Sequence, residues 1–143
     1  MSGKVFIAFG HDPTAHLELK EFLRSLTLTP VVLADMDDMG MTIIEKFEFY
    51  ADSCVFAFVI LSPDDKQLEA LAGSERWRAR QNVILELGWF MKHLGRKRVV
   101  ILHKGSVEIP SDLLGVLYLP YEKSIYEVSE KIRQRLKGVS LIG

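Results

Sequence analysis

The sequence contains a single cysteine, and this scarcity excludes an internal disulfide. Cys54 lies inside an apolar run, which is typical of a small buried hydrophobe in a reduced compartment. No stretch of about 18 apolar residues occurs, so no helix of this chain is expected to span a membrane. The first residues do not resemble a secretory signal. We therefore expect a cytoplasmic location.

A strong charge of either sign is also missing. The formal net charge is −1 and the isoelectric point is about 6.4. Nucleic acid and anionic membrane surfaces attract strongly basic proteins, so this balance gives no support for either as the main partner.

The motifs of several common enzyme classes are absent. The histidines His16, His93 and His103 have no metal-ligand spacing, and there is no H-E-x-x-H segment or cysteine pair, so no metal site is expected. The nucleophile elbow G-x-S-x-G is missing, which leaves no local sign of a serine hydrolase. Without G-x-G-x-x-G or a Walker loop, a Rossmann dehydrogenase and a P-loop NTPase are disfavoured.

The residues that are present describe one globular domain over residues 1–143, with 48% apolar and 26% charged residues. Apolar runs typical of strands alternate with helical periodicities. Strands are expected at residues 4–9, 30–34, 54–61, 98–103 and 116–121, and loops at residues 35–40 and 66–77. Helices are expected after a cap at Asp12 with Pro13, after a T-x-x-E capping box at Thr42 and Glu45, over residues 78–94 up to Gly95, and around Ile125, Val128, Ile132 and Leu136.

This alternation predicts an α/β fold with a parallel sheet and right-handed crossovers. We expect a flavodoxin-like three-layer sandwich with a five-stranded sheet in the order 2-1-3-4-5. Ligands of such sheets bind at the carboxyl ends of the strands where the order reverses, here between the first and third strands. The two loops that follow those strands are residues 10–12 and 62–65, so we expect the site there.

Glu86 is the most informative single residue. It lies in a largely apolar helix and projects onto the shoulder of the face that should meet the sheet, with Asn82 and Trp89 about one turn away. A carboxylate in that position costs free energy unless it has a partner. One interpretation is a structural ion pair with Arg78, Arg80 or Lys46. The other is a catalytic carboxylate that orients a sugar hydroxyl or stabilises an oxocarbenium-like transition state.

Two further groups allow both a structural and a functional interpretation. Residues 10–12 and Ser62 are ordinary turn and capping residues, or they cradle a phosphate or ribose. The basic patch of Arg76, Arg78 and Arg80 with Trp77 is a solvated surface, or it clamps a pyrophosphate while Trp77 stacks on a base. Arg80 is the best candidate for the pyrophosphate, with an ion pair to Asp64 or Asp65 as the alternative.

At this point the sequence resembles bacterial Toll/interleukin-receptor (TIR) domains that bind nucleotides. Five ordered blocks carry the resemblance over almost the whole chain. They are KVFIAFGHD at residues 4–12, GMTIIEKFE at 40–48, LSPDD at 61–65, RARQNVILELG at 78–88 and PSDLLGV at 110–116. The resemblance implies the TIR fold, a catalytic glutamate at Glu86, and a substrate site formed from Phe9, Gly10, His11, Asp12, Ser62 and Asp64, to which we add Arg80 and Asn82.

The family resemblance also implies an activity. Such domains are effectors of bacterial cyclic-oligonucleotide antiphage systems, and they hydrolyse NAD+ when a second messenger drives them together. The implied reaction is an SN1-like departure of nicotinamide, in which NAD+ is the substrate and neither cofactor nor metal is needed. The implied partners are NAD+, other TIR domains and a cyclic-nucleotide sensor of STING-like or SAVED type, fused or separate.

The loop after the second strand departs from the family, because it carries three aspartates where relatives often have proline and asparagine. The 143 residues include no sensor domain. Two other functions stay open at this stage. A TIR domain can signal as a non-catalytic scaffold, and a nucleoside deoxyribosyltransferase-like enzyme uses the same sheet with a carboxylate on a sugar.

Overall fold

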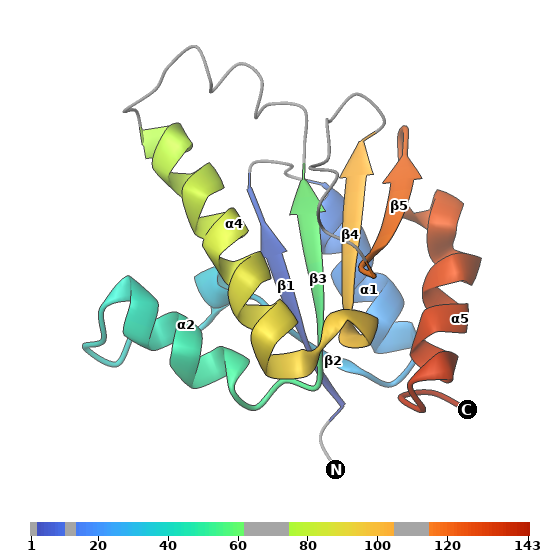
Figure 1. The fold of residues 1–143 in the computed structure, drawn as a ribbon, viewed down its shortest axis with the longest axis horizontal. Coiled ribbons are helices and arrows are strands. Elements are labelled where there is room, and N and C mark those ends of the chain that lie inside the picture. The colour runs from blue at the N-terminus through green and yellow to red at the C-terminus, as the bar shows by residue number, and fades with distance from the viewer. Residues whose placement is uncertain (1–2, 11–13, 62–74, 105–114) are drawn as a thin grey trace.

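The computed structural model describes residues 3–10, 14–61, 75–104 and 115–143, and residues 75–84 of this set through their backbone alone. Strands and helices alternate along these residues (Figure 1). The strands are β1 Lys4–Phe9, β2 Thr29–Val31, β3 Phe56–Leu61, β4 Val99–Lys104 and β5 Leu117–Tyr121. The α-helices are α1 Ala15–Ser25, α2 Ile43–Ala51, α4 Glu75–Leu94 and α5 Ser129–Gly138, with short 3-10 turns at Leu33–Asp35, Arg96–Arg98 and Ile125–Val128.

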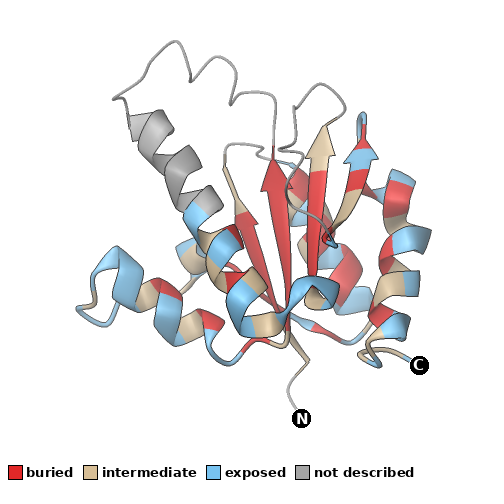
Figure 2. Ribbon diagram, in the orientation of Figure 1, coloured by how far each residue is buried: buried red, intermediate tan, exposed pale blue. Residues whose placement is uncertain are grey.

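The five strands form one parallel sheet in the order β2-β1-β3-β4-β5, as the alternation predicts. β3 lies at the centre, where Val5 pairs with Phe56 and Ala57 pairs with Val99. All six residues of β3 are buried, because helices cover both faces of the sheet. Figure 2 shows this buried strip along the middle of the sheet.

Helices cover the sheet in two outer layers, each with its own apolar core. Helices α1 and α5 pack on one face through residues such as Leu19, Phe22 and Ile132. Helices α2 and α4 pack on the other face through Phe47 and Phe90. This is the expected three-layer sandwich, and it places α2 beside α4.

Several boundaries differ from the sequence-based expectation. The second strand was expected over residues 30–34, but β2 ends at Val31 and a 3-10 turn follows. The amide of Asp35 bonds to the carbonyl of Val32 at 3.0 Å, and β1 offers β2 only a three-residue register, from Lys4 to Phe6. An edge strand with so short a ladder turns early, because few inter-strand hydrogen bonds hold it extended.

The ends of other helices and strands also differ from the expected ones. Helix α4 begins at Glu75, so the expected loop at residues 66–77 is wrong at its end, and residues 66–74 lie outside the described part. Helix α1 begins at Ala15 with Thr14 as its N-cap, which corrects the expected cap at Asp12. Asp12 and Pro13 themselves are outside the described residues. The expected strands at 54–61, 98–103 and 116–121 each shift or shorten by one or two residues.

The residues expected to begin α2 and to end α4 are confirmed. Thr42 and Glu45 form the capping box, in which the amide of Glu45 donates to Thr42 Oγ1 at 3.2 Å and the amide of Thr42 donates to Glu45 Oε1 at 2.8 Å. At the end of α4, Gly95 has φ of +84°, a left-handed conformation that favours glycine. The capping box matters for the site, because it sets where the wall made by α2 begins.

Candidate functional site

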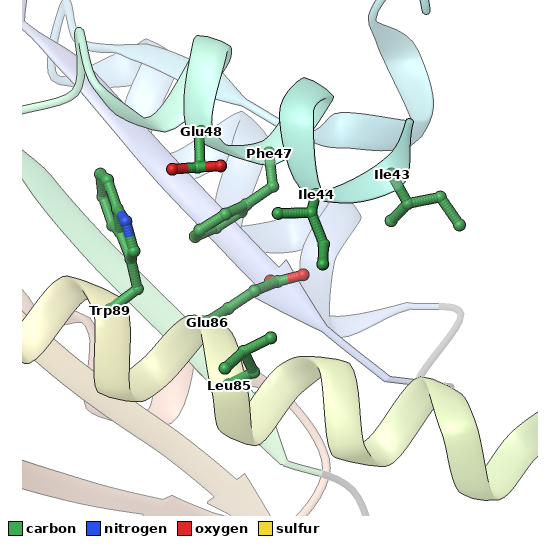
Figure 3. Close-up of a pocket in the computed structure, with 7 residues that line it drawn as sticks. All are labelled: Ile43, Ile44, Phe47, Glu48, Leu85, Glu86 and Trp89. Carbon is green, nitrogen blue, oxygen red and sulfur yellow. The ribbon is translucent and has the colours of Figure 1, made fainter. Parts of the chain in front are cut away.

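Helix α4 presents Glu86 to α2 rather than to the sheet. Its buried residues Leu87 and Phe90 face the strands, and Glu86 precedes Leu87 on the neighbouring side of the helix. There it lines a pocket of about 200 Å³ between the two helices, which Figure 3 shows. The pocket is lined by Ile43, Ile44, Phe47 and Glu48 of α2 and by Leu85, Glu86 and Trp89 of α4.

An aromatic cluster holds the two walls of this pocket together. The buried ring of Phe47 makes edge contacts with Phe6 of β1 at 5.5 Å, Trp89 at 5.1 Å and Phe90 at 5.5 Å between ring centroids. Edge-to-face pairs at these separations are favourable arrangements of aromatic rings. Phe47 therefore anchors α2 to both the sheet and α4, and the pocket is the space left beside that anchor.

The environment of Glu86 disfavours its charge. Burial raises the pKa of the Glu86 carboxyl from 4.5 to about 7. The ion pair with Lys46, one of the sequence-based alternatives, does not form, because the Lys46 ammonium binds Asp38 at 2.6 Å. The side chains of Arg78 and Arg80, the other candidate partners, lie outside the described residues. Within the described pocket lining there is no cationic side chain to offset the half-buried Glu86 carboxylate.

The acidic loop after β2 is tied to the helices on either side of it. Asp35 accepts from Lys20 of α1 at 2.7 Å, and Asp38 pairs with Lys46 of α2. The hydroxyl of Tyr50 donates to the carbonyl of Asp37 at 2.8 Å. Two of the three aspartates of this loop, Asp35 and Asp38, thus take lysine partners within the chain, and Asp38 binds the lysine that the sequence offered as a partner for Glu86.

The structure describes only part of the expected substrate site. Phe9 ends β1 half-buried and stacks on His16 with 3.9 Å between ring centroids, and the half-buried Gly10 follows directly. Arg80 and Asn82 lie on α4, one or two turns before Glu86, with side chains outside the described part. His11, Asp12, Ser62 and Asp64 also lie outside the described residues. The role of each of these residues stays a prediction.

Of the seven residues that line the pocket, the sequence singled out Glu86 and Trp89 but not Ile43, Ile44, Phe47, Glu48 and Leu85. Four of these lie in the block at residues 40–48, which carries the family resemblance but does not indicate a pocket. The available sign was periodicity, because Ile43 with Phe47 and Ile44 with Glu48 are each separated by four residues and share a helix side. Helical spacing alone could not tell that this side meets Glu86.

The described residues contain neither a candidate metal cluster nor a helix that could span a membrane. No group of three or more histidine, cysteine, aspartate or glutamate side chains there could hold a metal ion. No helix among them is both long enough and apolar enough to cross a membrane.

The sheet order and the two helical layers are those of a TIR-like fold. The SEFIR domain of interleukin-17 receptor B shares the fold, with a TM-score of 0.56 at 10% identity over 96% of both chains. A family model for the TIR domain of CAP12/Pycsar effector proteins matches residues 4–123, and the chain belongs to this family.

Relatives extend the match beyond the family model. The chain is 46% identical over 118 residues to an uncharacterised protein, YuaY, of Escherichia coli K12, covering 82% of this chain and 40% of that protein. It is 32% identical over 139 residues to protein tirC of Dictyostelium discoideum, covering 90% and 69%. It is 40% identical over 80 residues to the Pycsar effector BcPycTIR of Burkholderia cepacia, covering 54% and 26%. The chain therefore spans less than half the length of the first and third relatives.

Proposed function

We propose that this domain is an NAD+ glycohydrolase that cleaves the bond between nicotinamide and ribose, and that it acts as an effector in bacterial antiphage defence. The observation that carries the proposal is Glu86, a carboxylate held in an apolar pocket without a described cationic partner. A structural glutamate is normally paired, whereas a catalytic one is often kept in surroundings that perturb its pKa. Membership of the CAP12/Pycsar effector family supports the same conclusion.

The chemistry suits such a carboxylate. The bond between the ribose C1′ and the ring nitrogen breaks, and its electron pair leaves with nicotinamide, which becomes neutral. The positive charge passes to the ribose as an oxocarbenium-like centre. Glu86, once ionised, stabilises that charge more strongly than a carboxylate in water would, because the apolar pocket screens it less. Water, or the adenine of the same molecule, then bonds to C1′, and water releases a proton in doing so.

We propose the remaining site residues from the topology and the family resemblance. The carboxyl ends of β1 and β3 meet at one edge of the sheet, where the order reverses. We place the phosphates near Phe9, Gly10 and the residues His11, Asp12, Ser62 and Asp64, with Arg80 and Asn82 as contacts from α4. The nicotinamide ribose would then face Glu86. Neither a metal nor a separate cofactor enters this scheme.

Self-association is a second proposed property, and a specific surface favours it. The apolar side chains at the mouth of the pocket remain accessible, with Ile43 72% exposed and Ile44 and Leu85 each 60% exposed. Adjacent exposed apolar residues of this kind commonly mark contact surfaces. We propose that other copies of the domain pack nearby when a cyclic-nucleotide sensor brings them together.

The decisive test is nicotinamide release from NAD+, followed by chromatography at high protein concentration. We expect Glu86→Gln to abolish release, because the amide keeps the shape but loses the charge, a loss of about 100-fold or more in comparable electrostatic sites. Glu130→Gln on α5 is the matched control and should keep full activity. Full activity in Glu86→Gln would refute the catalytic assignment. Absence of release from the wild-type chain at every concentration would favour a scaffold.

A further inference from the structure

The pocket holds a second carboxylate and an aromatic wall that the cleavage step does not use. Glu48 of α2 and Trp89 of α4 both line it, and Figure 3 shows Glu48 pointing toward the side where Trp89 stands. The Glu86 carboxylate points toward the opposite side, beneath Ile44 (Figure 3). One end of the pocket therefore presents an indole ring and the Glu48 carboxylate, and the other end presents the Glu86 carboxylate.

The Trp89 ring is fixed before any ligand arrives. It stacks on His93 with 4.4 Å between ring centroids, and it makes edge contacts with Phe47 at 5.1 Å and Phe90 at 5.2 Å. Phe47 and Phe90 are themselves buried. A ring held in this way loses little conformational freedom on binding, and an indole is the aromatic group that attracts cations most strongly.

The charges around the pocket favour a positive occupant. Glu48 lines it with a carboxylate, Glu86 adds a second negative charge when it is ionised, and the described lining contains no basic side chain. The basic residue of α2, Lys46, forms an ion pair with Asp38. A neutral ligand would leave this imbalance, whereas a ligand with one positive charge would reduce it.

The size of the pocket fits one aromatic ring. Its volume is about 200 Å³, and it is lined largely by apolar atoms of Ile43, Ile44, Phe47 and Leu85. An apolar cavity of about 150 Å³ accommodates a benzene molecule, so a six-membered ring with a small substituent fits here.

We propose that Trp89 and Glu48 form a subsite for an aromatic cation, and that its occupant is the pyridinium ring of NAD+. The identity of this cation rests on the proposed function. The subsite binds the charge that the ring carries before cleavage, whereas Glu86 acts on the charge that appears on the ribose. Because the nicotinamide product is neutral, the same subsite holds the product weakly.

Because the two carboxylates act on different charges, their substitution should change different kinetic constants. An interaction with ground-state charge lowers KM and gives no help to the transition state, in which that charge is leaving the ring. We therefore expect Glu48→Gln to raise the KM for NAD+ by about threefold to tenfold, with kcat unchanged or increased. Glu86→Gln should instead lose kcat.

Binding is measured separately from turnover, in the Glu86→Gln background. Nuclear magnetic resonance titrations follow the Trp89 indole N–H with two probes of nearly equal size, the cation 1-methylnicotinamide and neutral nicotinamide. We expect the cation to bind at least threefold more tightly. Adding Glu48→Gln or Trp89→Leu should remove this preference, while Trp89→Phe should keep part of it and Glu130→Gln all of it.

Equal affinity for the two probes would overturn the subsite, and so would an unchanged preference in folded Glu48→Gln and Trp89→Leu variants. A fall in kcat without a rise in KM for Glu48→Gln would also overturn it. These outcomes are distinguishable from failure of the proposed function. A preference for the cation without nicotinamide release would support the subsite and refute the proposed reaction. Nicotinamide release without that preference would support the reaction and refute the subsite.

Discussion

Replacing Glu86 by glutamine should make the domain more stable at alkaline pH while it removes activity. Burial raises the pKa of Glu86 from 4.5 to about 7. The folded state therefore holds this proton more tightly than the unfolded chain does. The resulting stability is fully present below the unfolded value of 4.5 and is lost as the pH rises through about 7.

The magnitude follows from the two pKa values. Their difference corresponds to a cost of about 3.5 kcal/mol when the Glu86 carboxyl is fully ionised, at about 1.4 kcal/mol for each pH unit. About 1 kcal/mol of this is already present at pH 5, so the change between pH 5 and pH 8 is about 2.5 kcal/mol. Glutamine does not titrate, so its variant lacks this loss.

The assay is urea unfolding of the wild type, Glu86→Gln and Glu130→Gln at both pH values. The quantity of interest is the change in the free energy of unfolding between pH 5 and pH 8, compared between variants. This comparison cancels the fixed cost of burying an amide and the titration of every other group. A wild type and a Glu86→Gln variant with the same pH dependence would refute the burial argument. The Glu130→Gln control should follow the wild type.

Three further predictions can be checked with the same protein. If ionised Glu86 is needed, kcat/KM for NAD+ should rise with pH, reach half of its maximum near pH 7 and level off above that, and a flat profile from pH 5 to pH 8 would contradict this. Thr42→Ala should cost about 1 kcal/mol of unfolding free energy in urea titrations, because it removes the cap of α2; Ser53→Ala just after the same helix is the milder control. Specific activity should increase with protein concentration or crowding if association completes the site, and a constant value over a wide range would argue against it.

Some features of the site could be inferred from the residues alone. Glu86 was conspicuous because it interrupts an apolar helical face, and the buried neighbours Leu87 and Phe90 confirm which face meets the sheet. The sequence alone could not show which basic residue, if any, pairs with Glu86. Lys46 was one candidate partner of Glu86, and the folded loop brings Asp38 to it instead.

The pocket wall formed by α2 shows a second limit of prediction from sequence. Helical spacing placed Ile43 with Phe47 and Ile44 with Glu48 on shared sides of the helix, but it could not show which segments those sides contact. The anchor is Phe47, whose ring contacts Phe6 from the first strand and Phe90 from a helix more than forty positions later in the chain. Contacts of this sequence separation leave no periodic trace in either segment.

The class of fold could be predicted from the amino-acid order, because unbroken apolar runs separated by amphipathic segments bury their surfaces in a parallel sheet covered by helices. The position of the capping box and the unusual carboxylate at Glu86 could be predicted in the same way. The surroundings of that carboxylate could not, because they depend on packing between distant segments. The packing of α2 against α4 creates the pocket and raises the pKa of Glu86, and the folded loop after β2 brings Asp38 to Lys46. Each of these depends on distances between segments that only packing brings together.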